Sequence, residues 1–280
     1  MNPAPRPAPA RPQGTVTRGT THPNRLRRVD RWIAHAAARA LRDAADPVVV
    51  DLGYGAAAWT PRDLRDRLRV VRPDVEVVGI EIDPARVAAA SAYADGSLSF
   101  RRGGFEVPLD GRDAAVIRAF NVLRQYDETE VRGAWATMTS RLVPGGMLVE
   151  GTCDELGRHA WWVSIEAGHD VPTSLTLSTR LAGLGAPSDL AERLPKALIH
   201  RNVAGERVHD YLRALDRAWA AAAPHASFGA RQRWIAAVRS VRDSGVPVLD
   251  GPARWRLGEV TVAWSAVTPS GHSATPTSGR

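Results

Sequence analysis

The stretch Val48-Val49-Val50-Asp51-Leu52-Gly53-Tyr54-Gly55 constrains the fold of this chain more than any other part of the sequence. Three consecutive β-branched residues predict a strand that is buried on both faces, as in a parallel sheet. The strand ends at a carboxylate, and two glycines follow it. Glycine allows a sharp turn at Gly53 and Gly55, and it lets a ligand approach where a Cβ would intrude.

A helix is predicted directly after this glycine loop. Thr60 is expected to be the N-cap and Pro61 the first helical residue, with Asp63 reaching back to complete a capping box. A strand, a glycine loop and a helix in this order bind nucleotide-like ligands at the carboxyl edge of a parallel sheet.

The alternation of strands and helices continues along the first half of the chain. The further predicted strands are Glu76–Glu81, Leu98–Arg101, Ala114–Phe120 and Met147–Glu150, and helices are predicted from Leu26 to Arg42, from Pro61 to Val70, after Asp83-Pro84 and through Val131 to Leu142. Short loops between alternating elements favour an α/β fold with a doubly wound, mostly parallel, Rossmann-like sheet.

Beyond Gly151 the pattern changes. The elements predicted there are a hairpin of His159–Ile165 and Ser174–Arg180, helices at Glu206–Ala223 and Arg231–Arg242, and two closing strands at Val246–Leu249 and Glu259–Val267. On the hairpin, Trp161 and Trp162 are expected to point to opposite faces, so that only one of them needs to lie in the core. The predicted organisation is a disordered segment at 1–16, one domain at 17–267 with a core at 44–151, an elaboration at 152–245 and closing strands at 246–267, and a disordered tail at 268–280.

Composition restricts the compartment and the partners. The only cysteine, Cys153, excludes an internal disulfide and is typical of a reducing compartment. No apolar run approaches the length of about 18 residues that a membrane-spanning helix needs. Residues 1–12 alternate Pro, Ala and Arg without the hydrophobic segment of a signal peptide. Together these observations predict a cytoplasmic protein. The histidines show no metal-ligand spacing, so we predict no metal site.

The chain is basic, with 37 Lys and Arg against 30 Asp and Glu and a net charge of +7. Lys196 is the only lysine, and arginine suits bidentate contact with phosphate or carboxylate. The polar face of the helix Leu26–Arg42 carries several of these arginines. Such a face is more often solvated than bound to phosphate, although RNA stays open as a partner.

Two carboxylates are predicted at the ends of adjacent parallel strands. Glu81 ends the second strand, where an acceptor-only group held at the sheet edge suits the two hydroxyls of a ribose. Asp51 precedes the glycines, where it can orient the loop or meet a cationic group of a ligand through water. Together with the glycine loop, these residues predict a nucleoside site.

Three motifs in order resemble the class I S-adenosylmethionine-dependent methyltransferases over about Val48 to Glu150. They are Asp51-Leu52-Gly53-Tyr54-Gly55, Gly79-Ile80-Glu81-Ile82-Asp83 and Pro144-Gly145-Gly146-Met147-Leu148. The resemblance implies S-adenosylmethionine as the cofactor. One departure is Ala57, where the family often has a third glycine; a methyl group there narrows the loop without abolishing the turn.

The resemblance also implies where the cofactor contacts this chain. The glycine loop would face the methionine part, the acid Glu81 would bind the ribose, and Gly104 and Phe105 would flank the adenine. Asn121 would lie near the methionine part or the acceptor. The predicted cofactor-binding residues are Asp51, Gly53, Tyr54, Gly55, Glu81, Ile82, Gly104, Phe105 and Asn121.

The acceptor is predicted to be a small molecule, because no separate nucleic-acid module is present and the elaboration can enclose a pocket. Candidates for the acceptor pocket follow the fourth and fifth strands: Arg118, Asn121, Arg124, Gln125, Tyr126, Thr152, Cys153, Asp154 and Glu155. Of these, Asn121, Tyr126 and Arg118 are the catalytic candidates, and no general base is identified. The oligomeric state is left open.

Four alternatives stay open at this point. RNA is a possible acceptor, and without a base the chain can be a cofactor-binding protein that does not catalyse. The pattern Gly53-x-Gly55-x-x-Ala58 also fits a nicotinamide dinucleotide enzyme. Such sites generally have an apolar residue at the position of Asp51 and an acid about 20 residues past the glycines, whereas Glu81 lies 26 residues past Gly55. The loop 17–25 is either a linker or an N-terminal lid over the cofactor, with Arg18 or Arg25 meeting a carboxylate.

Overall fold

The β-branched run forms the middle one of five parallel strands. β1 spans Val48–Leu52, and all its residues are buried. The computed structural model describes residues 12–270. The other strands are β2 Glu76–Glu81, β3 Leu98–Arg102, β4 Ala114–Phe120, β5 Leu142–Cys153, β6 His159–Glu166, β7 Ser174–Thr179 and β8 Glu259–Ala263.

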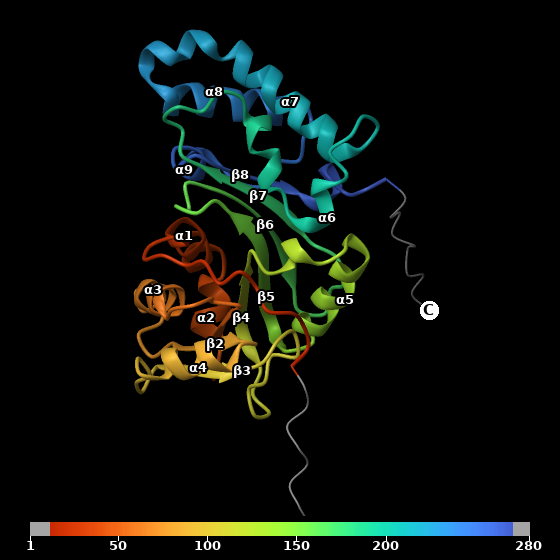
Figure 1. Ribbon diagram of the computed structural model, residues 1–280. Coiled ribbons are helices and arrows are strands. Elements are labelled where there is room, and N and C mark those ends of the chain that lie inside the picture. The colour runs from red at the N-terminus through yellow and green to blue at the C-terminus, as the bar shows by residue number, and fades with distance from the viewer. Residues whose placement is uncertain (1–11, 271–280) are drawn as a thin grey trace, which may run out of the picture.

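Helices connect and cover these strands (Figure 1). The α-helices are α1 Arg27–Ala36, α2 Ala38–Asp43, α3 Trp59–Leu68, α4 Pro84–Ser91, α5 Glu128–Thr139, α6 Lys196–Ile199, α7 Arg207–Ala221, α8 Ala230–Asp243 and α9 Pro252–Trp255. The 3-10 helices are η1 Leu123–Gln125, η2 Pro187–Arg193, η3 Ala223–Phe228 and η4 Trp264–Ala266.

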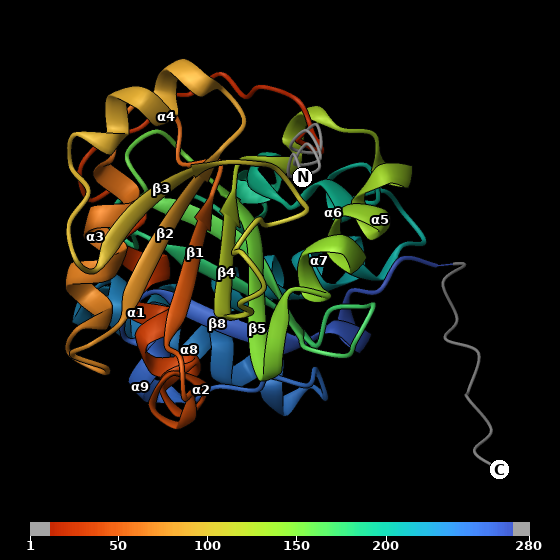
Figure 2. The ribbon, with the colours of Figure 1, turned by 90° about the horizontal axis from the view of Figure 1, so that it is seen from below.

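The eight strands form one sheet in the order β3-β2-β1-β4-β5-β6-β7-β8. The first five are parallel, and β6, β7 and β8 continue the sheet in antiparallel fashion. Figure 2 shows β3, β2, β1, β4 and β5 side by side. The order 3-2-1-4-5 confirms the predicted doubly wound α/β fold, and its direction reverses between β1 and β4, the point where such sheets bind ligands.

Both faces of the sheet are covered. Val49 packs on the side of α1 and α3, whereas Val48 and Val50 face the side of α5, α7 and α8. Trp161 and Trp162 point to opposite faces, as predicted, but both are fully buried. Burial of both is the alternative in which the second tryptophan also fills the core: α1 covers Trp162 through Trp32, and η2 covers Trp161 through the carbonyl of Leu190.

The C-terminal region contains one closing strand where two were predicted. The predicted hairpin forms as β6 and β7, and β8 pairs with β7 at the edge of the sheet. Residues 246–249 make only an isolated bridge from Val248 to Val262. Pro247 has no N–H to extend a ladder, which limits this segment to a short contact.

The first two predicted helices differ from expectation at their ends. The helix predicted over Leu26–Arg42 is divided at Ala37 into α1 and α2. α3 begins at Trp59, and Thr60 does not cap it; instead, the Thr60 hydroxyl donates to Asp51 at 2.6 Å. The predicted capping box is therefore absent at α3, because a buried carboxylate takes the hydroxyl. Asp83 does cap α4, as predicted.

The ends of the chain were predicted to be disordered. Residues 1–11 and 271–280 lie outside the described part of the chain. Residues 12–16 are placed, and they hydrogen-bond to the body of the protein as described below. At the other end, the backbone N–H of Ser270 donates to Glu206 at 2.7 Å.

Candidate functional site

A cavity of about 420 Å³ opens at the point where the sheet order reverses. Its walls come from the loop after β1, the loop after β4, the end of β5 and residues 17–26 of the N-terminal segment. The lining residues are Thr17, Arg18, Gly19, Thr20, Thr21, Arg25, Leu26, Asp51, Leu52, Gly53, Tyr54, Gly55, Thr60, Phe120, Asn121, Arg124, Gln125, Cys153, Glu155 and Arg193. Ligand sites commonly measure about 300–1,000 Å³, so the volume suits a small molecule.

The glycine loop turns as the sequence predicts. Gly53 and Gly55 adopt φ values of 71° and 88°, in the left-handed region that favours glycine. A Cβ on Gly55 would lie 2.8 Å from the carbonyl oxygen of Gly19, which accepts a hydrogen bond from the N–H of Ala56 at 2.9 Å. The close approach that the sequence assigned to a ligand is therefore made by the chain's own backbone.

Glu81 lies at the end of β2, next to this loop, and it is buried. One carboxylate oxygen accepts from the N–H of Gly55 at 3.0 Å, and the other accepts from the N–H groups of Ile82 and Asp83 at 2.9 and 3.3 Å. Arg86 lies 3.6 Å from the same carboxylate. Glu81 thus holds the glycine loop against β2, and this is the position from which a ribose contact is predicted.

Residues 12–21, which we call the strap, run across the carboxyl edge of the sheet. The carbonyl of Gln13 accepts from the N–H of Phe105 at 3.0 Å, and the N–H of Thr15 donates to the Tyr126 hydroxyl at 2.6 Å. A Cβ on Gly104 would lie 1.8 Å from the Gln13 oxygen. The carbonyl of Thr17 accepts from Arg86 at 2.9 Å.

The strap leaves little room over the predicted adenine and ribose contacts. The space bounded by the strap, Glu81, Ile82, Gly104 and Phe105 measures about 20 Å³, which holds about one water molecule. The strap therefore covers the nucleoside half of the predicted site, while the 420 Å³ cavity lies over the other half. Tyr126 lines the small space and not the large cavity.

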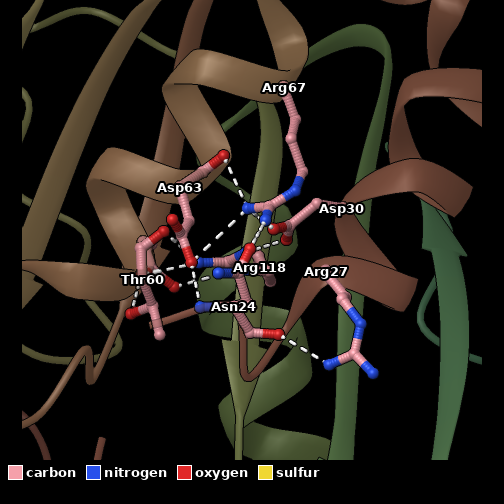
Figure 3. A network of polar contacts seen from close by, with 8 residues as sticks. Asn24, Arg27, Asp30, Thr60, Asp63, Arg67 and Arg118 are labelled. Atoms are coloured by element: carbon pink, nitrogen blue, oxygen red, sulfur yellow. Dashed lines mark hydrogen bonds and ion pairs between the residues drawn. The ribbon is translucent and has the colours of Figure 1, made fainter. Parts of the chain in front are cut away.

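A buried ionic network stands behind the cavity (Figure 3). Arg118 of β4 is fully buried, and it donates to Asp51 of β1, to Asp30 of α1 and to the carbonyl of Thr60 in α3. Its guanidinium is fully used by these partners, and it does not line the cavity. This corrects the assignment of Arg118 to the acceptor pocket: it is buried behind the cavity wall, where it positions the end of β1.

The network extends to the root of the strap. Arg67 of α3 pairs with Asp30 at 3.0 Å and also donates to the side chain of Asn24. The N–H of Asn24 donates to Asp63 at 2.5 Å, and Figure 3 shows these side chains converging between α1 and α3. Burial raises the pKa of Asp30 to about 6, although Arg118 and Arg67 oppose the shift. The chain is thereby fixed at residue 24, immediately before α1.

Asn121 joins the ends of β4 and β5 at the cavity wall. It adopts a positive φ of 60°, which asparagine tolerates better than most residues. Its side-chain oxygen accepts from the N–H of Cys153 at 3.0 Å, and its amide donates to the Cys153 sulfur at 3.3 Å. Burial raises the pKa of the Cys153 thiol, so the thiol stays protonated at neutral pH.

The remaining acceptor candidates separate into two groups. Arg124, Gln125 and Glu155 line the large cavity. Thr152 and Asp154 do not: the Thr152 hydroxyl donates to the carbonyl of Arg193, and Asp154 caps the turn before β6. Arg193 also lines the cavity, although it was not among the predicted acceptor residues. It ends the 3-10 helix η2 in the region 152–245, where no sequence motif marks it as a site residue.

The basic face of α1 is partly engaged within the protein. Arg27 donates to the carbonyls of Asn24 and Leu156, and Arg28 donates to the Ser178 hydroxyl and to the carbonyl of Leu257. Over residues 12–270 no group of three or more His, Cys, Asp and Glu side chains is arranged to hold a metal ion. None of the helices described is both long and apolar enough to span a bilayer.

Comparisons with known proteins give structural likeness without sequence likeness. No family model and no curated protein matches this chain. Among solved structures, an amino pentose methyltransferase of calicheamicin biosynthesis from Micromonospora echinaspora, bound to S-adenosylmethionine, is 19% identical with a TM-score of 0.35. The match covers 55% of this chain and 63% of that one, less than two thirds of its length.

Two further structures complete this comparison. The N-methyltransferase NodS from Bradyrhizobium japonicum, in complex with S-adenosylhomocysteine, is 18% identical with a TM-score of 0.35, and the match covers 50% of this chain and 67% of that one. The plantazolicin methyltransferase BamL is 13% identical with a TM-score of 0.36 over 47% of this chain and 46% of that one. All three are methyltransferases. Each match covers about half of this chain.

Proposed function

We propose that this protein transfers a methyl group from S-adenosylmethionine to a small-molecule acceptor. The observation that carries the proposal is the joint position of the Gly53–Gly55 loop and Glu81. A buried carboxylate at the end of β2 is held 3.0 Å from the N–H of Gly55, beside a cavity at the switch point between β1 and β4. This arrangement suits a ribose and a methionine tail lying across one sheet edge.

The residues fit the cofactor once the strap has moved. Glu81 would hold the ribose, the N–H of Phe105 would face the adenine, and the glycine loop with Asn121 would hold the methionine part. The strap now uses the Phe105 N–H through Gln13 and fills the cradle above Gly104. Binding of a nucleoside therefore requires residues 12–17 to leave these positions, whereas the 420 Å³ cavity needs no such change.

When bound, S-adenosylmethionine supplies an electrophilic methyl group on a sulfonium. The protein then acts mainly by holding the acceptor in line with that group and by excluding water. The cavity wall at Asn121 and Cys153 would position the acceptor, and the Arg118 network would keep the β1 loop rigid. The buried thiol is no base at neutral pH, because its pKa is raised. Cys153 is therefore not expected to deprotonate the acceptor.

The test compares three ligands by isothermal calorimetry and by thermal shift. S-adenosylmethionine and S-adenosylhomocysteine are expected to bind and to stabilise the protein, whereas NAD is not. Stabilisation by NAD alone would identify a dinucleotide enzyme and contradict the proposal.

Transfer is tested separately with tritiated S-adenosylmethionine and a cell extract that is fractionated into metabolites, protein and RNA. Label in the metabolite fraction is expected. Label confined to RNA would reject the small-molecule acceptor, and cofactor binding without any transfer would reject catalysis.

A further inference from the structure

The 420 Å³ cavity has an unbalanced charge. Four arginines line it, Arg18, Arg25, Arg124 and Arg193, together with two carboxylates, Asp51 and Glu155. Asp51 is already paired with the buried Arg118 at 2.7 Å. Glu155 is therefore the one lining carboxylate, among the residues described, that can offset four guanidinium groups.

Most of these arginines have no carboxylate partner within residues 12–270. Arg193 lies 3.0 Å from its neighbour Glu192. Arg25 is 9% exposed, and it donates to the backbone carbonyls of Thr20 and Asp154. Arg124 donates to the carbonyl of Glu192 at 3.2 Å. Carbonyl groups satisfy the N–H donors but do not neutralise the charge. Arg25 is buried, whereas Arg124 is exposed and Arg193 half-buried, so the last two guanidinium groups are accessible to a ligand in the cavity.

Two of the four lie where an acceptor is expected. Arg124 follows β4, and the backbone of Arg193 is bound to Thr152 near the end of β5. In the order β1-β4-β5 these strand ends are one and two positions from the glycine loop. Partial burial lowers the pKa of Arg124, and the nearby charge of Arg193 lowers it further.

We propose that the methyl acceptor carries an oxyanion, either a carboxylate or a phosphate, that is bound by Arg124 and Arg193. The proposal rests on the methyl transfer proposed above. S-adenosylmethionine brings a sulfonium, an ammonium and one carboxylate, so the cofactor adds a net positive charge to a cavity that is already basic. An anionic acceptor neutralises this charge, and guanidinium groups bind oxyanions with directed, charge-assisted hydrogen bonds. The volume of about 420 Å³ suits a small acid.

The test uses benzoate, phenyl phosphate and the neutral isostere benzamide as probes, with and without S-adenosylhomocysteine. Dissociation constants are measured by calorimetry for the wild type, Arg124→Gln and Arg193→Gln. Arg39→Gln is the matched control, since Arg39 is an exposed arginine on α2 that pairs with Asp43. Each cavity variant is expected to weaken binding of the anionic probe about tenfold or more, with S-adenosylhomocysteine affinity changed less than about twofold.

The arms distinguish the possible results. Preference for benzoate or for phenyl phosphate identifies the oxyanion. Benzamide binding as tightly as benzoate, or anion binding unchanged in both cavity variants, would overturn the proposal. If the protein binds the anion through Arg124 and Arg193 but does not bind S-adenosylhomocysteine, the anion subsite is supported and the methyltransferase function is rejected. Circular dichroism spectra of the variants establish that each is folded.

Discussion

Glu150 offers a quantitative test of the structure, because it is a buried acid that pairs with no cation among residues 12–270. It lies in β5, with Ala119 of β4 and Val163 of β6 beside it in register, and it is 1% exposed. Its side-chain partner is the indole N–H of Trp135, at 3.3 Å. Burial raises the pKa of Glu150 from 4.5 to about 8, and the Trp135 hydrogen bond only partly opposes this.

The sign of the effect follows from proton binding. Above pH 4.5 the unfolded chain releases this proton, whereas the folded protein keeps it up to about pH 8. The unfolded state therefore binds fewer protons, and the free energy of unfolding falls as the pH rises through this range. Linkage over this interval gives a cost from Glu150 of about 1 kcal/mol at pH 5 and about 4–5 kcal/mol at pH 8.5.

Glu150→Gln removes this cost while keeping the shape of the side chain and an acceptor for Trp135. The variant is expected to be more stable than the wild type by about 1 kcal/mol at pH 5 and by about 4–5 kcal/mol at pH 8.5, so that its advantage grows by about 3–4 kcal/mol between the two pH values. Urea unfolding followed by tryptophan fluorescence measures both, and the difference between variant and wild type cancels the other titrating groups. A stability difference that does not change between the two pH values would refute the assignment of a protonated buried acid.

Three other changes test the site and its support. Replacing Glu81 by Ala is expected to weaken S-adenosylhomocysteine binding by about 1–3 kcal/mol, the scale for losing hydrogen bonds to a charged group; calorimetry on the folded variant with unchanged affinity would exclude the ribose role. Removing residues 1–16 is expected to tighten S-adenosylhomocysteine binding, since the contacts of Gln13 and Thr15 no longer compete; weaker binding in the same titration would show that the strap belongs to the bound state. Arg118→Met is expected to lower the free energy of unfolding by about 3–5 kcal/mol, because Asp51 is left buried without its cation and Asp30 keeps only Arg67. Urea unfolding measures this, with Arg39→Gln as a control, and equal stability of the two variants would argue against the network.

The part of the fold that follows from local pattern was predictable from the sequence. The β-branched run at Val48, the acid at Glu81 and the apolar run at Ala114–Phe120 each specify a strand within a few residues. The turn at Gly53 and Gly55 follows equally from local chemistry. The parallel order of the first five strands then follows from the alternation with helices.

What the sequence could not supply are pairings between distant residues. Arg118 is a charge inside an otherwise apolar strand, which signals a buried partner, but that partner, Asp30, lies 88 residues away. Thr60 was predicted to cap α3, but its hydroxyl donates to Asp51, a tertiary contact that the local sequence does not reveal. The strap follows a Pro/Ala/Arg-rich segment and has no hydrophobic periodicity. The sequence around Gln13 therefore could not predict the hydrogen bond from the Phe105 N–H to the Gln13 carbonyl.

The anchoring of the chain at Asn24 gives the strap a property that a free inhibitor lacks. A segment tethered beside its own target competes at an effective concentration of about millimolar, whatever the amount of protein present. Dilution therefore cannot release it, and only a rise in the concentration of the nucleoside can. A protein built in this way would respond to the supply of its nucleoside ligand and stay closed when that supply is low.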